Sequence, residues 1–173
     1  MLKLLLKLIF STVSAFTNIN CIIPSLPYTI QNLPTNYQQM VYEVQKHFNK
    51  YSYFHNQELD ISEEFCTPCH SIEIDPQDIS GYITLTGIYD GNYNNWVCNP
   101  INIYLSPSLT WDNTIFNIIM HEILHSKGLY HSRETDSVMN NTIIVDTQGI
   151  PIKDYPRFSL TWNDLYGLRN YII

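Results

Sequence analysis

Residues 121–131 read HEILHSKGLYH, and this stretch decides how the rest of the chain is interpreted. His121 and His125 are four positions apart, so on an α-helix their side chains lie on one face, one turn from each other. Gly128 can adopt the left-handed conformation that most residues avoid, which ends a helix and reverses the chain toward His131. The spacing therefore predicts three imidazoles around one metal ion.

The chemistry of this donor set favours a catalytic zinc ion. Three neutral imidazoles leave one tetrahedral position open, and water there becomes a nucleophile near neutral pH. Glu122 lies beside the pair of histidines, where we expect it to act as general base. The alternative is a polar helix with unrelated histidines, which leaves the apolar core face of the same helix unexplained. HExxHxxGxxH is a peptidase signature, so we predict hydrolysis of peptide bonds.

Two further positions extend the pattern. Ser132 follows the third histidine directly, and Met139 lies eight positions after His131. In both respects the chain resembles the matrixins, or matrix metalloproteinases, a family of the metzincin clan in which that methionine forms the Met-turn. Weaker similarity extends over about residues 26–172. It includes the first-helix segment 33–52, Trp111, and the segment 160–172, with Asp164 on a family aspartate.

The resemblance implies an α+β fold, the metzincin or zincin-like catalytic domain, with a twisted five-stranded mixed sheet and three main helices. It implies one catalytic zinc held by His121, His125 and His131. Glu122 would be the general base, and Met139 a hydrophobic floor under the metal. The substrate would be a protein or peptide, bound along an edge strand somewhere within residues 81–105.

The chain also departs from the family. Tyr104 stands where matrixins have a structural-zinc histidine, so a second zinc of that type is not expected. Calcium stays open as a further ion, although Ser106 and Leu109 replace the acidic family ligands. Asn141, Thr142 and Ile143 replace the Pro-x-Tyr wall of the specificity pocket. The depth and preference of that pocket therefore cannot be carried over.

Along the chain, short alternating segments bounded by turn formers predict strands, and apolar stripes predict helices. Thr35, with Gln38 three residues later, predicts a capping box at the start of the first helix. Thr161 is the expected cap of the last helix. We expect strands at 27–31, 58–62, 70–74, 81–88 and 101–105, and a metal-binding helix at 112–127.

The chain of 173 residues suffices for one domain. Its first residues, MLKLLLKLIFSTVSA, are typical of a signal peptide cleaved near Ala15, so we expect a leader at 1–15 and a secreted catalytic domain at 16–173. Lys7 interrupts the apolar run, which keeps a buried or membrane-surface amphipathic segment as the alternative. After leader removal, no stable membrane insertion is expected.

Four cysteines, Cys21, Cys66, Cys69 and Cys98, remain after that cleavage. An even number in an oxidising compartment favours two disulfides among three possible pairings. The alternatives are a metal site in CTPCH, formed by Cys66, Cys69 and His70, or free thiols.

The formal net charge of −7 argues against nucleic acid binding, because phosphate binding depends on clustered basic residues and the nine lysines and arginines do not cluster in the sequence. No oligomerisation signal is apparent, so a monomer is the default. Two other classes compete with the peptidase hypothesis. One is a catalytically silent zinc protein that captures peptides or inhibitors, and the other is a structural protein that matches the motif by accident.

Overall fold

The computed structural model describes residues 7–9, 21–22, 25–76, 81–84, 87–90, 95–98, 100–140, 142–144 and 153–170. Its centre is a five-stranded sheet, as predicted. In spatial order the strands are β4 (Ile61–Ser62), β3 (Tyr28–Thr29), β5 (His70–Ile74), β9 (Asn102–Leu105) and β6 (Gly81–Thr84). The first four strands run parallel, and β6 pairs antiparallel with β9, so the sheet is mixed.

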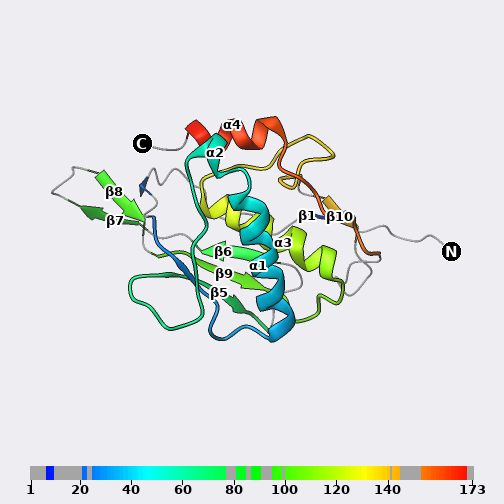
Figure 1. The fold of residues 1–173 in the computed structure, drawn as a ribbon, viewed down its shortest axis with the longest axis horizontal. Coiled ribbons are helices and arrows are strands. Elements are labelled where there is room, and N and C mark those ends of the chain that lie inside the picture. Colours follow the sequence, from blue (N-terminus) through cyan, green and yellow to red (C-terminus); the bar gives the residue numbers. More distant parts are fainter. Residues whose placement is uncertain are drawn as a thin grey trace.

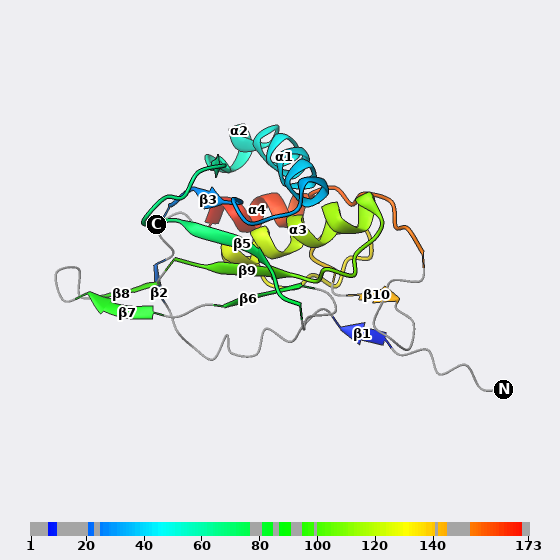
Figure 2. The same ribbon diagram turned by 90° about the horizontal axis from the view of Figure 1, so that it is seen from below.

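The helices pack on one face of this sheet (Figure 2). They are α1 (Thr35–Asn49), the short α2 (Ser52–His55), α3 (Asp112–Ser126) and α4 (Trp162–Asn170). α3 packs against α1 on one side and contacts β6 and β9 of the sheet. The three longer helices agree with the prediction, and α2 is an addition to it. No helix among the described residues has the length and hydropathy of a membrane span.

A separate small sheet corrects one predicted strand. The segment 81–88 was expected to form one strand, but β6 ends at Thr84 and β7 (Gly87–Asp90) pairs with β8 (Asn95–Cys98). With β2 (Cys21–Ile22), these strands form a three-stranded sheet whose β7–β8 hairpin projects from the body (Figure 1). Alternation within a strand does not reveal a change of sheet, which is why the expectation was wrong.

A pair of short strands brings distant segments together. β1 (Lys7–Ile9) pairs antiparallel with β10 (Thr142–Ile144). Apart from β1, the predicted leader 1–15 lies outside the described residues.

The core lies between the sheet and the helices. From β5 and β9, Ile72, Ile103 and Leu105 point into it and are at most 1% exposed. α3 is buried on nearly its whole circumference, since 13 of its 15 residues are buried. The predicted apolar stripe of α1 is confirmed: Met40, Val41, Val44 and Phe48 are all buried. Such an enclosed helix fixes the direction of the side chains that it carries.

The two predicted helix caps have different outcomes. α1 has no capping box, because Pro34 is the N-cap residue and Thr35 is already helical. The side-chain amide of Gln38 instead donates to the Leu33 carbonyl oxygen at 2.9 Å. At α4 the predicted cap is confirmed, because the Asp164 amide donates to Thr161 Oγ1 at 3.3 Å.

Candidate metal site

α3 presents two histidines from the same face. His121 and His125 are 1% and 2% exposed, and their ring centroids lie 4.5 Å apart. This is the geometry expected of positions separated by four on a helix. Because the helix around them is buried, the two rings have few alternative orientations.

The end of α3 turns the chain back toward these rings. Gly128 has φ 92°, the left-handed conformation predicted for it. Its amide donates to the His125 carbonyl oxygen at 2.9 Å, and the Leu129 amide donates to the Leu124 carbonyl oxygen at 3.0 Å. These two bonds form a Schellman motif, which satisfies carbonyl groups that a helix end leaves without partners. The chain is thereby directed to His131.

The three histidines gather as predicted. Their ligand atoms all lie within 4.8 Å of one another, and the Nε2 atoms of His125 and His131 are 3.1 Å apart. Two nitrogens that each bind one tetrahedral zinc at 2.0–2.1 Å are separated by about 3.3 Å. The three imidazoles therefore fit a zinc ion in their chemistry, and the His125–His131 pair also matches its spacing.

Backbone carbonyls fix the tautomers of the two helical histidines. His121 Nδ1 lies 2.8 Å from the Val138 carbonyl oxygen, and His125 Nδ1 lies 2.7 Å from that of Leu129. A carbonyl oxygen only accepts hydrogen bonds, so each Nδ1 carries the proton and donates it. Each Nε2 then presents a lone pair. Such supporting bonds orient metal-binding imidazoles and raise their basicity.

Burial keeps all three imidazoles neutral. It lowers the pKa of His125 to about 4 and holds that of His121 well below its usual range, where the neighbouring His125 adds to the effect. Burial also lowers the pKa of His131. Only neutral imidazole binds a metal, so the site is in its ligating form at neutral pH.

The other two predicted site residues are buried near the triad in the fold. Glu122 follows His121 on α3 and is 3% exposed, and Met139 is fully buried. Met139 belongs to a compact loop, in which the Ser132 amide donates to the Met139 carbonyl oxygen at 2.9 Å. The Val138 carbonyl that supports His121 comes from the same loop.

Sequence reasoning missed the side chain that shapes this loop. Ser137 is fully buried; its hydroxyl donates to Asp164 and accepts from the Met139 amide at 2.9 Å. The supporting carbonyls of Val138 and Leu129 were also missed. Asp164 had been noted only as a match to a family aspartate. A serine two residues before the methionine was the available signal, but its partner lies 27 positions away.

Two of the positions that depart from the family, Ser106 and Leu109, are buried structural residues. Leu109 is 4% exposed within the core, and the hydroxyl of the buried Ser106 accepts from the Ser108 amide at 3.2 Å. Neither residue offers a carboxylate to calcium. Of the pocket wall, Asn141 lies outside the described residues, and Thr142 and Ile143 belong to β10.

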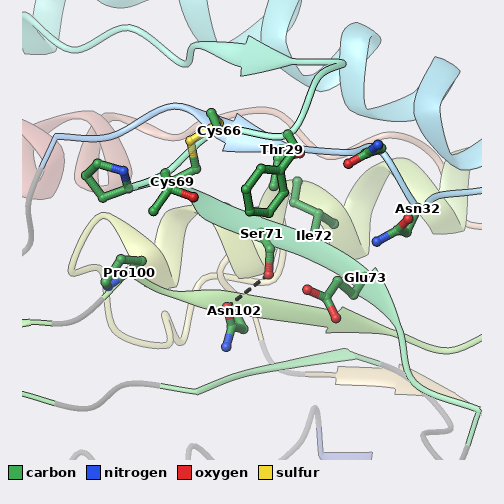
Figure 3. A pocket seen from close by; sticks show the side chains of 13 residues that line it. Thr29, Asn32, Cys66, Cys69, Ser71, Ile72, Glu73, Pro100 and Asn102 are labelled. Carbon is green, nitrogen blue, oxygen red and sulfur yellow. Dashed lines mark hydrogen bonds between the residues drawn. A yellow bond between two sulfur atoms is a disulfide. The ribbon is translucent and has the colours of Figure 1, made fainter.

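The alternative metal site in CTPCH is not formed. Cys66 and Cys69 are joined in a disulfide, and His70 Nδ1 accepts a hydrogen bond from the Ile101 amide at 2.8 Å. The side chains of Cys21 and Cys98 lie outside the described residues. The disulfide borders a pocket of about 290 Å³ over β5 and β9, in which the Ser71 hydroxyl bonds to Asn102 (Figure 3). The histidine triad does not line this pocket.

The edge of the sheet nearest α3 is formed by β6. This strand pairs with β9 on one side and with no described strand on the other, and it contacts α3. A free strand edge offers backbone donors and acceptors to an extended chain.

Comparison with known proteins identifies the family. The family model described as matrixin matches residues 38–171, which include the triad, Glu122, Met139 and the whole of α4. No curated protein matches the chain. The chain belongs to the matrixin family, whose members are zinc-dependent metalloproteases.

Proposed function

We propose that this chain is a secreted zinc endopeptidase that acts as a monomer on protein or peptide substrates. In this proposal residues 1–15 are a removable leader, and residues 16–173 form the catalytic domain, braced by disulfides. The observation that carries the proposal is the convergence of three neutral imidazoles at the end of a buried helix. The match to the matrixin family supports the reaction class.

His121, His125 and His131 would hold the zinc ion. A zinc ion in such a site supplies a Lewis acid, which makes water nucleophilic near neutral pH and polarises a peptide carbonyl. The protein contributes the orientation of the ligands, through the carbonyls of Val138 and Leu129. We assign no calcium ion to the described residues.

Glu122 would serve as the proton carrier. It follows His121 on α3 and is buried, and in this proposal its carboxylate accepts a proton from the attacking water and later donates it to the leaving amine. Met139, fully buried in the loop that supports His121, would form the apolar floor of the site. A dry floor strengthens electrostatic interactions above it.

The free edge of β6 is the expected binding strand for substrate. An extended peptide would form hydrogen bonds with the backbone of β6. Such bonds recognise the main chain of the substrate more than its side chains. In this proposal the substrate pairs with β6, residues 81–84, which lies within the segment 81–105 expected from the sequence.

A quenched fluorescent peptide library tests the proposal on the full-length protein. Glu122→Gln should lower the cleavage rate by about 10²–10⁴, the usual contribution of general acid–base catalysis, while zinc content stays at one ion per chain. Glu64→Gln is the matched control. Glu64 is exposed in the loop between β4 and β5, so this variant should cleave at the wild-type rate.

The same experiment separates the competing classes. A silent zinc-binding protein predicts bound zinc but equal, negligible cleavage by the wild type and by Glu122→Gln. A structural protein with an accidental motif predicts no stoichiometric zinc at all. Either result contradicts the peptidase proposal.

A further inference from the structure

An unusual group of exposed rings lies on the helical side of the molecule. Tyr53 and Phe54 of α2 are 87% and 44% exposed, and Trp162 and Tyr166 of α4 are 74% and 69% exposed. We call these four residues the aromatic patch. They are four of the six large apolar side chains that are exposed among the described residues. Grouped exposure of this kind marks an interaction site more often than scattered apolar residues do.

Trp162 lines two neighbouring hollows. One is a polar hollow of about 470 Å³, lined by Trp162 together with Arg133, Glu134, Asp136 and Asn163. The other is a more apolar hollow of about 770 Å³, whose lining includes Phe54 and, like that of the first, Asp136. None of the three clustered histidines lines either hollow.

The polar hollow holds groups that are available to a ligand. Arg133 and Asp136 are exposed, and their side chains make no hydrogen bond or ion pair within the part of the chain that the structure describes. Asn163 Nδ2 donates to Glu134 Oε1, which orients the remaining oxygens of both side chains. A guanidinium and a carboxylate are both fork-shaped, so each can bond two adjacent polar groups of one ligand.

We propose that this hollow binds a neutral hexopyranose unit of a glycan, with Trp162 as the stacking platform. A pyranose has one face of C–H groups and an edge of adjacent hydroxyls. The face of an indole ring carries partial negative charge, which attracts the weakly positive C–H groups. Asp136 would accept hydrogen bonds from two adjacent hydroxyls, and Arg133 would donate to their oxygens.

Charge and shape favour this occupant over others. Two carboxylates and one guanidinium line the hollow, and the chain carries a formal net charge of −7, so sulfated glycans and anionic lipids are disfavoured. A single pyranose stacks on the face of one ring, so it does not need several rings to form one flat surface. Phe54 and Trp162 meet at an interplanar angle of 87° with centroids 5.8 Å apart, so the aromatic patch is not a flat apolar face.

Titration calorimetry and NMR with neutral oligosaccharides test the site on the full-length protein. Cellohexaose and chitohexaose are the probes, because their equatorial hydroxyls leave a flat C–H face. At least one should bind saturably, and Trp162→Ala or Asp136→Ala should weaken that binding by about tenfold or more. Phe65→Ala is the matched control, since Phe65 is 75% exposed but belongs to the loop between β4 and β5 and lines neither hollow. It should bind as the wild type does.

Several results would overturn the site. One is the absence of saturable binding of either probe at about 10 mM. The others are that Trp162→Ala binds as tightly as the wild type, or that Phe65→Ala loses as much affinity as Trp162→Ala. Preferential binding of a heparin oligosaccharide or of anionic vesicles, or dimerisation that Trp162→Ala abolishes, would reassign the patch. Circular dichroism and thermal unfolding establish that each variant is folded. Glu122→Gln should retain sugar binding, so failure of this site and failure of the peptidase proposal are distinguishable.

Discussion

The buried carboxylate of Asp164 accepts a hydrogen bond from the hydroxyl of Ser137, whose oxygen lies 2.9 and 3.0 Å from the two carboxylate oxygens. This contact ties the first turn of α4 to the loop that carries Met139. Since the Val138 carbonyl of that loop supports His121, the last helix contributes indirectly to the orientation of the triad. Asp164 also accepts from the amide and the hydroxyl of Thr161, at 2.8 and 3.0 Å.

Asp164→Asn should therefore destabilise the protein. The amide keeps the shape of the side chain, but its nitrogen cannot accept the bonds from Ser137 and Thr161. Loss of hydrogen bonds to a charged, buried acceptor costs about 1.5–3 kcal/mol, measurable by urea unfolding of the metal-free protein. The control is Asp154→Asn on an exposed residue, for which a change below about 0.5 kcal/mol is expected. Equal effects of the two substitutions would show that the Ser137 contact contributes nothing.

Gly128→Ala tests the turn that directs the chain to His131. Because Gly128 has φ 92°, a side chain there should cost about 1–2 kcal/mol and weaken zinc binding. Gly167→Ala is a matched control inside α4, where an added Cβ would lie 3.6 Å from Leu129 Cγ, an ordinary contact. Alanine in a helix interior should be neutral or stabilising by about 0.5–1 kcal/mol. If both variants bind zinc as the wild type does, the turn does not determine the position of His131.

The parts that could be predicted from sequence are those encoded by local spacing. The predicted bounds of the metal-binding helix agree with those of α3 to within one residue. Apolar positions on all sides indicate a buried helix, and the glycine that follows marks its end. The convergence of the triad follows from the same local geometry. The cap of α4 was also predictable, since Thr161 and Asp164 have the spacing of a capping box.

The parts that could not be predicted depend on contacts between distant segments. Thr35 has the right residue type for a cap, but Pro34 ends the preceding turn one position earlier and takes the N-cap place. The supporting carbonyls of Val138 and Leu129 carry no signal, because every residue has a carbonyl and only the tertiary fold selects which one meets an imidazole. The same holds for the partnership of Ser137 with Asp164.

Zinc should stabilise the folded protein, and this stabilisation should require His131 as a ligand. A ligand that binds only the folded state adds about 4 kcal/mol to the free energy of unfolding when its free concentration is about 1,000 times the dissociation constant. Thermal unfolding of the chelator-treated protein, with and without buffered zinc, measures this gain. His131→Ala should lose most of it, whereas His47→Gln, which changes a histidine of α1 outside the triad, should keep it. An equal gain in His131→Ala would remove that residue from the ligand set.

Acid should destabilise the metal-free protein from about pH 6.5 downward, the usual histidine pKa. Burial lowers the folded-state pKa of both His47 and His55, with the charges of Lys50 and Arg157 adding to the effect at His47. Below pH 6.5 the unfolded chain therefore binds protons that the folded chain does not, and the free energy of unfolding falls until the folded pKa values are passed. Asp164 acts in the opposite sense, because burial raises its pKa in the folded protein. Urea unfolding at pH 7.5 and 5.5 should show the loss, and the double variant His47→Gln/His55→Gln should show a smaller one. An unchanged pH dependence in that variant would assign it to the remaining histidines, the buried His70 and the three of the triad, and not to His47 and His55.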